Sequence, residues 1–155
     1  MKRFIAGIAL ILSLVAAPMM AMAESHAKTA EADKAPLFIN LTTDDTWSAA
    51  KAIMFAHEKS LKNGHPTAIW LNVRAVYLAD KKRPSHVHGL MKESGKSIQD
   101  MLADFMAAGG EVIMCQACSG AAGLTQADYI DGVTMGSWPV VEGWLFRDGV
   151  STLSW

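Results

Sequence analysis

Short apolar runs alternate along this chain with segments whose apolar residues recur at helical spacing, and this alternation constrains the fold more than any other feature. The runs lack the polar alternation of half-exposed strands, so we expect strands that are buried on both faces of a parallel sheet. Strand followed by helix followed by strand indicates right-handed βαβ units. The sequence therefore predicts an α/β fold, a three-layer sandwich with a mainly parallel five-stranded sheet. The expected strands are residues 36–41, 67–72, 111–114, 133–135 and 150–155.

Two long helices are expected between the first three strands. The first has an apolar face from Trp47 to Leu61 that includes His57, and Gly64 supplies its left-handed end. We expect His57 to be a packed residue of this face. The second helix begins at a capping box formed by Ser97 and Asp100. Shorter helices are expected after the third strand and at 137–146.

The first 23 residues have the features of a secretory signal peptide. Lys2 and Arg3 precede an apolar run, and Ala21-Met22-Ala23 matches the small-residue cleavage pattern. We expect cleavage after Ala23, which leaves no stable membrane anchor and directs the protein to the periplasm or outside the cell. Residues 24–35 are expected to be a flexible linker, and residues 36–155 form the predicted domain.

Charge argues against nucleic acid as a partner. The formal net charge is −1, and it becomes −3 when Lys2 and Arg3 are removed. The remaining chain contains no basic block of the length that phosphate backbones require. We therefore expect no nucleic-acid binding.

Both cysteines, Cys115 and Cys118, lie at the junction between the third strand and the following helix. A C-x-x-C at this position is compatible with a redox couple, half of a metal site, or a reactive cysteine with a helper, whereas two buried apolar cysteines are the non-functional alternative. The loop that a disulfide would close is too short to stabilise the fold appreciably. Chemistry is therefore the better explanation of the pair, with Cys115 at the strand end as the main group.

The long connection at 73–96 contains the other candidate site residues. His86 and His88 project to the same side of an extended loop and, with the two cysteines, would complete a zinc or copper site. A metal-binding module is therefore the alternative function. Thiol chemistry of the cysteine pair, the main hypothesis, requires no cofactor. Arg74 follows the second strand closely, so it is expected at the same sheet edge as Cys115 and is a candidate for binding an anionic substrate.

The element order resembles the DsrE/DsrF-like family, which includes the small sulfur-relay subunits of the DsrEFH and TusBCD complexes. The resemblance rests on the opening strand and Ala-rich helix, the turn at 107–110, the strand ending in Cys115, and Gly123 eight residues later. It implies that Cys115 carries a persulfide and passes sulfane sulfur between proteins. Cys118 matches the second cysteine of members that have C-x-x-C.

The resemblance also implies a homo-oligomer and a protein that donates or accepts sulfur. Two features depart from the relay subunits: the predicted export, and Ala122 where an Arg often precedes the family's glycine. We therefore expect an exported DsrE-like protein that binds or transfers sulfane sulfur, or performs thiol redox exchange, through Cys115 with Cys118. Such a protein would be a sulfur carrier or a sulfurtransferase.

Overall fold

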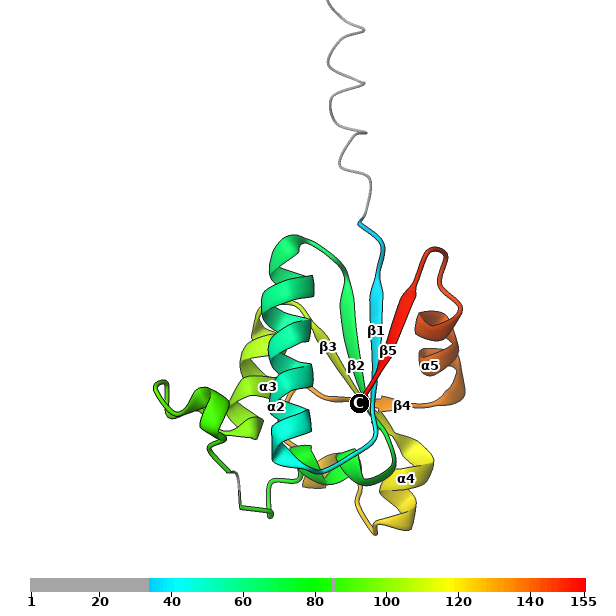
Figure 1. The fold of residues 1–155 in the computed structure, drawn as a ribbon. Coiled ribbons are helices and arrows are strands. Elements are labelled where there is room, and N and C mark those ends of the chain that lie inside the picture. Colours follow the sequence, from blue (N-terminus) through cyan, green and yellow to red (C-terminus); the bar gives the residue numbers. More distant parts are fainter. Residues whose placement is uncertain (1–33, 85) are drawn as a thin grey trace, which may run out of the picture. The chain divides into compact units, whose positions relative to one another are not determined.

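Five strands form one parallel sheet in the order β4-β3-β2-β1-β5 (Figure 1). The computed structural model describes residues 34–84 and 86–155. Every pair of neighbouring strands is parallel, so the predicted α/β class is confirmed and the sheet is parallel throughout. The strands are β1 Leu37–Leu41, β2 Thr67–Leu71, β3 Glu111–Cys115, β4 Thr134–Gly136 and β5 Ser151–Ser154.

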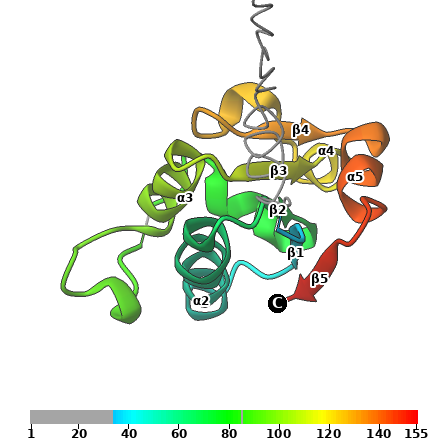
Figure 2. The ribbon, with the colours of Figure 1, turned by 90° about the horizontal axis from the view of Figure 1, so that it is seen from above.

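Helices cover both faces of the sheet, as the three-layer prediction requires. Helices α2 (Thr46–Met54) and α3 (Ile98–Ala107) lie on one face, and α5 (Trp138–Leu145) lies on the other (Figure 2). Each face has its own apolar cluster. The larger cluster joins α2 and α3 to the sheet, and the smaller one contains Phe38, Ala68, Ile113 and Val141. Burial on both sides thus explains the unalternated strands β1, β2 and β3, whereas the edge strand β5 is exposed along its length, so the expectation of burial on both faces is wrong for it.

The helix predicted from Trp47 to Leu61 is present but changes its geometry along its length. After α2 the chain continues as a π-helical segment, Phe55–Ser60, and a 3-10 turn, Leu61–Asn63. Gly64 ends the helix with a φ of 83°, in the predicted left-handed conformation. His57 is packed edge-on against Phe105, with ring centroids 6.2 Å apart.

The long connection after β2 is partly helical. It contains a 3-10 segment, Val73–Ala79, and a later 3-10 turn, Gly89–Met91. The Ser97–Asp100 capping box is confirmed at the start of α3. The chain then passes through β3 into the short helix α4 (Gln116–Ala121) and the 3-10 turn Gln126–Asp128. These segments bring the candidate site residues to the carboxyl edge of the sheet.

The predicted signal peptide (1–23) and most of the predicted linker (24–35) lie outside the described residues. In the described part of the chain, no helix has the length and apolar character needed to cross a membrane.

Candidate functional site at the carboxyl edge of the sheet

Cys115 and Cys118 form a disulfide where β3 ends and α4 begins. Cys115 is both the last residue of β3 and the N-cap of α4, and the two Cα atoms are 5.3 Å apart. The backbone N–H of Cys118 donates to Sγ of Cys115 at 3.2 Å. The strand end therefore fixes one sulfur atom, and the first turn of the helix brings the second to it.

The two sulfur atoms differ in their access to solvent. Cys115 is 7% exposed and belongs to the larger apolar cluster. Cys118 is half-buried and lines a cavity of about 310 Å³ together with residues from two elements. Those residues are Val73, Arg74 and Tyr77 from the 3-10 segment and Ala121 and Ala122 from the end of α4. An incoming molecule therefore meets Cys118 at the cavity wall.

The end of β2 supplies two polar contacts to Cys118. The backbone N–H of Val73 donates to Oδ1 of Asn72 at 2.8 Å and to Sγ of Cys118 at 3.3 Å. The same Oδ1 lies 3.1 Å from Sγ of Cys118, while Nδ2 of Asn72 donates to Oδ1 of Asn40 at 3.3 Å. Val73 has a φ of 50°, and it is the one non-glycine residue with positive φ among the residues described. A left-handed conformation is unusual for a β-branched residue.

Arg74 reaches the same cavity but is paired with a carboxylate from the connection between β1 and α2. Its Nε and Nη2 donate to the two carboxylate oxygens of Asp44 at 2.9 and 2.8 Å. Arg83 donates to the same carboxylate at 3.2 Å and stacks over the ring of Tyr77 at 4.1 Å. The hydrogen bonds from Arg74 and Arg83 lower the pKa of Asp44, and Asp44 in turn raises the pKa of Arg74.

A buried hydroxyl pair anchors α4 below the disulfide. The hydroxyl of Tyr129 donates to Oγ of Ser119 at 2.7 Å, and that Oγ donates to the carbonyl oxygen of Cys115 at 2.7 Å. Tyr129 and Ser119 are each 1% exposed, and burial raises the pKa of Tyr129. This chain of hydrogen bonds fixes the backbone that carries Cys115.

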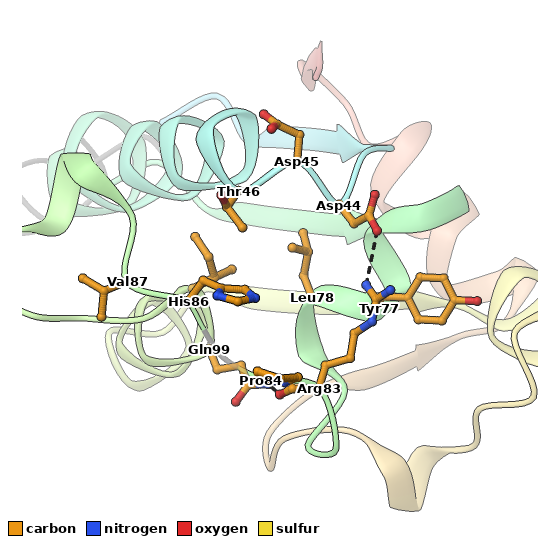
Figure 3. A pocket seen from close by; sticks show the side chains of 11 residues that line it. Asp44, Asp45, Thr46, Tyr77, Leu78, Arg83, Pro84, His86, Val87 and Gln99 are labelled. Atoms are coloured by element: carbon orange, nitrogen blue, oxygen red, sulfur yellow. Dashed lines mark hydrogen bonds and ion pairs between the residues drawn. The ribbon is translucent and has the colours of Figure 1, made fainter.

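A larger cavity of about 740 Å³ is also lined by Tyr77 (Figure 3). Asp44, Tyr77, Arg83 and His86 are among the residues that line it, and the Asp44–Arg83 ion pair forms part of its wall. Neither cysteine lines this cavity. Tyr77 lines both cavities, so the two cavities adjoin at this residue of the 3-10 segment.

The structure does not gather the four proposed metal ligands. His86 lines the larger cavity, away from the disulfide. His88 is 9% exposed, its Nδ1 accepts from the backbone N–H of Leu90 at 3.1 Å, and its ring packs on Trp47. Within residues 34–84 and 86–155, no group of three or more His, Cys, Asp or Glu side chains is arranged to hold a metal ion. His88 thus has a capping role here.

Arg74 was expected at the same sheet edge as the cysteines, and in the structure it lines the cavity beside Cys118. The contacts of Asn72 and Val73 with Cys118, and also the support from Ser119 and Tyr129, were not predicted from the sequence. The position of Asn72 directly after β2 was the one available indication, because polar residues at strand ends face the ligand edge. A valine offers no sequence indication of a positive φ.

Comparisons with known proteins agree with this architecture. The model of the DsrE/DsrF-like family matches residues 27–150. The ychN protein from E. coli is 21% identical over 76% of this chain and 98% of its own, with a TM-score of 0.59. The protein of unknown function MTH1491 from Methanobacterium thermoautotrophicum is 13% identical over 77% of this chain and 97% of its own, with a TM-score of 0.58.

At these identities the two structures establish the fold alone. No curated protein matches the chain. The family model, in contrast, spans the whole sheet except the last strand and includes both cysteines. The chain therefore belongs to the DsrE/DsrF-like family.

Proposed function

We propose that this protein binds and transfers sulfane sulfur, or exchanges thiols with disulfides, through Cys115 and Cys118 as part of a sulfur relay. The observation that carries the proposal is the cysteine pair at the carboxyl edge of a DsrE-like sheet, closed as a disulfide with one sulfur at a cavity wall. Parallel α/β sheets bind ligands at this edge. A disulfide between cysteines three residues apart closes a very short loop and adds little to the stability of the fold. A chemical role is therefore the better reason for the cysteine pair.

The pair supports two related reactions. In the reduced state a cysteine thiolate attacks a polysulfide, takes its terminal sulfur as a persulfide, and releases a polysulfide that is one sulfur shorter. In the oxidised state a thiolate opens the disulfide through a mixed-disulfide intermediate. A neighbouring cysteine within disulfide distance ends either intermediate by closing the ring again.

The sequence supports a compartment and a class of partner for this function. Export by the predicted signal peptide would place the protein in the periplasm or outside the cell, where a dithiol is oxidised more readily than in a cytosol. Family resemblance favours a protein that donates or accepts the sulfur, and a homo-oligomeric assembly. Metal is not required for either reaction.

Mass spectrometry tests this function directly. The reduced protein is incubated with polysulfide, freed of small molecules, and weighed intact beside the Cys115→Ala and Cys118→Ala variants and the variant that carries both substitutions. We expect the mass of one or more added sulfur atoms on the wild type and loss of this mass when both cysteines are replaced. Absence of any adduct, together with stoichiometric zinc or copper by elemental analysis, contradicts the proposal and supports the metal-binding alternative.

A further inference from the structure

We propose that the oxidised pair is opened at Cys118, by a small anionic sulfur nucleophile that enters the cavity between the 3-10 segment and α4, with Cys115 as the leaving thiolate. The nucleophile is hydrosulfide or a low-molecular-weight thiolate, which share the same attacking atom and charge. This inference rests on the proposed function, and it assigns unequal roles to the two sulfur atoms.

Access distinguishes the two sulfur atoms first. Thiolate attack on a disulfide depends on which sulfur the nucleophile can reach. Cys115 is 7% exposed and packs in the apolar cluster, whereas Cys118 is half-buried and forms part of the cavity wall. The cavity volume of about 310 Å³ admits a small molecule. Attack at Cys118 therefore requires no rearrangement of the core.

The cavity also suits an anion. The guanidinium of Arg74 lines it, and two nitrogen atoms of this group are bonded to Asp44, which fixes its orientation. Apart from this ion pair, the remaining lining side chains are Tyr77, Val73 and two alanines from α4, together with Cys118 itself. Because Asp44 balances the charge of this guanidinium, the wall presents a fixed ion pair among apolar groups, which admits a small, soft anion without a strong electrostatic barrier.

The leaving sulfur is prepared to hold negative charge. Sγ of Cys115 accepts the backbone N–H of Cys118 at 3.2 Å, as the N-cap acceptor of α4. A hydrogen bond from a backbone N–H stabilises a thiolate more than a thiol, and a more stable thiolate leaves faster. The hydrogen bonds from Tyr129 through Ser119 to the carbonyl oxygen of Cys115 keep this geometry when the disulfide opens.

Two groups outside α4 also hold the attacked sulfur at the cavity wall. The Val73 N–H and the Asn72 amide oxygen contact Sγ of Cys118 at 3.3 and 3.1 Å. Asn72 directly follows β2 and Val73 begins the 3-10 segment, so Cys118 is positioned by the junction after the neighbouring strand and not only by its own helix. The two residues act as positioning residues for Cys118.

The reaction with hydrosulfide balances without any external oxidant. A bond forms between the hydrosulfide sulfur and Sγ of Cys118, and the Cys115–Cys118 bond breaks with its electron pair on Cys115. The incoming sulfur is oxidised to the sulfane level, Cys115 is reduced to a thiolate, and the hydrosulfide proton passes to solvent as the persulfide ionises. A thiolate gives the corresponding mixed disulfide on Cys118.

Rapid quenching locates the first adduct. The oxidised full-length protein is mixed with sodium sulfide in one arm and reduced glutathione in the other, alkylated after increasing short times, and fragmented between residues 115 and 118. At the earliest times we expect the added group on Cys118 at an excess of about tenfold over Cys115, since access controls the rate. A first adduct on Cys115, or equal labelling, overturns the inference.

Single-cysteine variants provide a measurement that sulfur migration cannot affect. Reduced Cys115→Ser retains only Cys118, and reduced Cys118→Ser retains only Cys115. We expect Cys118 to react with a small aromatic disulfide at least about tenfold faster than Cys115, again through access. A faster Cys115 contradicts the assignment.

The outcomes separate this inference from the proposed function. Persulfide that forms on Cys115 first, or a disulfide that resists both nucleophiles while the reduced protein still loads from polysulfide, overturns only the inference. Failure of the reduced protein to load sulfur overturns the function itself.

Discussion

The backbone N–H of Val73 donates to Sγ of Cys118, and Val73 reaches this position only in a left-handed conformation with a φ of 50°. A β-branched residue in this region costs on the order of 1–3 kcal/mol. The side chain of Val73 is 56% exposed, so packing repays little of that cost. Backbone strain is thus located where the start of the 3-10 segment contacts the cysteine pair, as is typical of functional sites.

Replacement of Val73 by glycine tests this strain. Glycine adopts positive φ freely and retains the N–H, so we expect Val73→Gly to leave the free energy of unfolding unchanged or to raise it by up to about 1 kcal/mol. Urea denaturation measures the change. The matched control is Val87→Gly, because Val87 is 54% exposed and does not have a positive φ.

We expect Val87→Gly to lower the free energy of unfolding by about 0.5–1 kcal/mol, the ordinary cost of a new glycine. Equal destabilisation by the two substitutions would show that Val73 is not strained.

Asn72→Ala tests the polar contact on the attacked sulfur. In the reduced protein the Cys118 thiol is placed to donate to Oδ1 of Asn72, which favours the protonated sulfur, and the same oxygen shares the Val73 N–H. Alanine removes this acceptor, so the backbone N–H of Val73 then donates only to Sγ of Cys118. Arg74 and Tyr77, which also line the cavity, are unchanged.

We therefore expect Cys118 in an Asn72→Ala, Cys115→Ser background to be alkylated a few-fold faster at neutral pH than in Cys115→Ser alone, because a larger fraction is thiolate. Time courses with iodoacetamide measure this rate. The free energy of unfolding should fall by about 1 kcal/mol through loss of the cap on Val73. An unchanged alkylation rate would mean that Asn72 is only a structural cap.

Hydrophobic periodicity and the residues that begin or end helices were sufficient to predict most of the fold. Gly64 ended the first helix and the Ser97–Asp100 capping box began α3 as expected, because both depend on local chemistry. The change to π-helical geometry at Phe55–Ser60 was not predictable, since tertiary packing decides it. The metal hypothesis depended on the path of the loop that carries His88, and a contact with Leu90 and Trp47 set that path instead.

Tyr129→Phe tests the buried support of the disulfide. The substitution removes the hydroxyl that donates to Ser119 and retains the ring. We expect a loss of about 1–2 kcal/mol in the free energy of unfolding, the cost of an unpaired buried partner. We also expect faster alkylation of Cys115 in Cys118→Ser, because α4 is held less firmly.

Tyr77→Phe is the matched control for this substitution. Tyr77 is half-buried and is contacted by Arg74 and Arg83 through its ring. We expect Tyr77→Phe to change the free energy of unfolding of the protein by less than about 0.5 kcal/mol. Equal effects of the two substitutions would contradict a specific role for the Tyr129–Ser119 hydrogen bond.

Asp44→Asn tests whether the ion pairs at the end of β1 contribute to stability in a pH-dependent way. Hydrogen bonds from Arg74 and Arg83 lower the pKa of Asp44 in the folded protein below its value of 3.8 in an unfolded chain. A lowered folded pKa means that the contribution is fully present above the unfolded pKa and is lost as the pH falls through the folded pKa. We therefore expect the urea midpoint of the wild type to exceed that of Asp44→Asn by a constant amount from pH 7 to about pH 5.

Below about pH 4 this difference in midpoint should shrink as the carboxylate is protonated. Asp131→Asn is the control, because Asp131 is 98% exposed and pairs with Lys81 at 3.1 Å on the surface. Its effect should stay below about 0.5 kcal/mol throughout, since exposed ion pairs contribute little. A difference for Asp44→Asn that persists unchanged to pH 2 would show that the Arg74 and Arg83 contacts do not depend on the charge of Asp44.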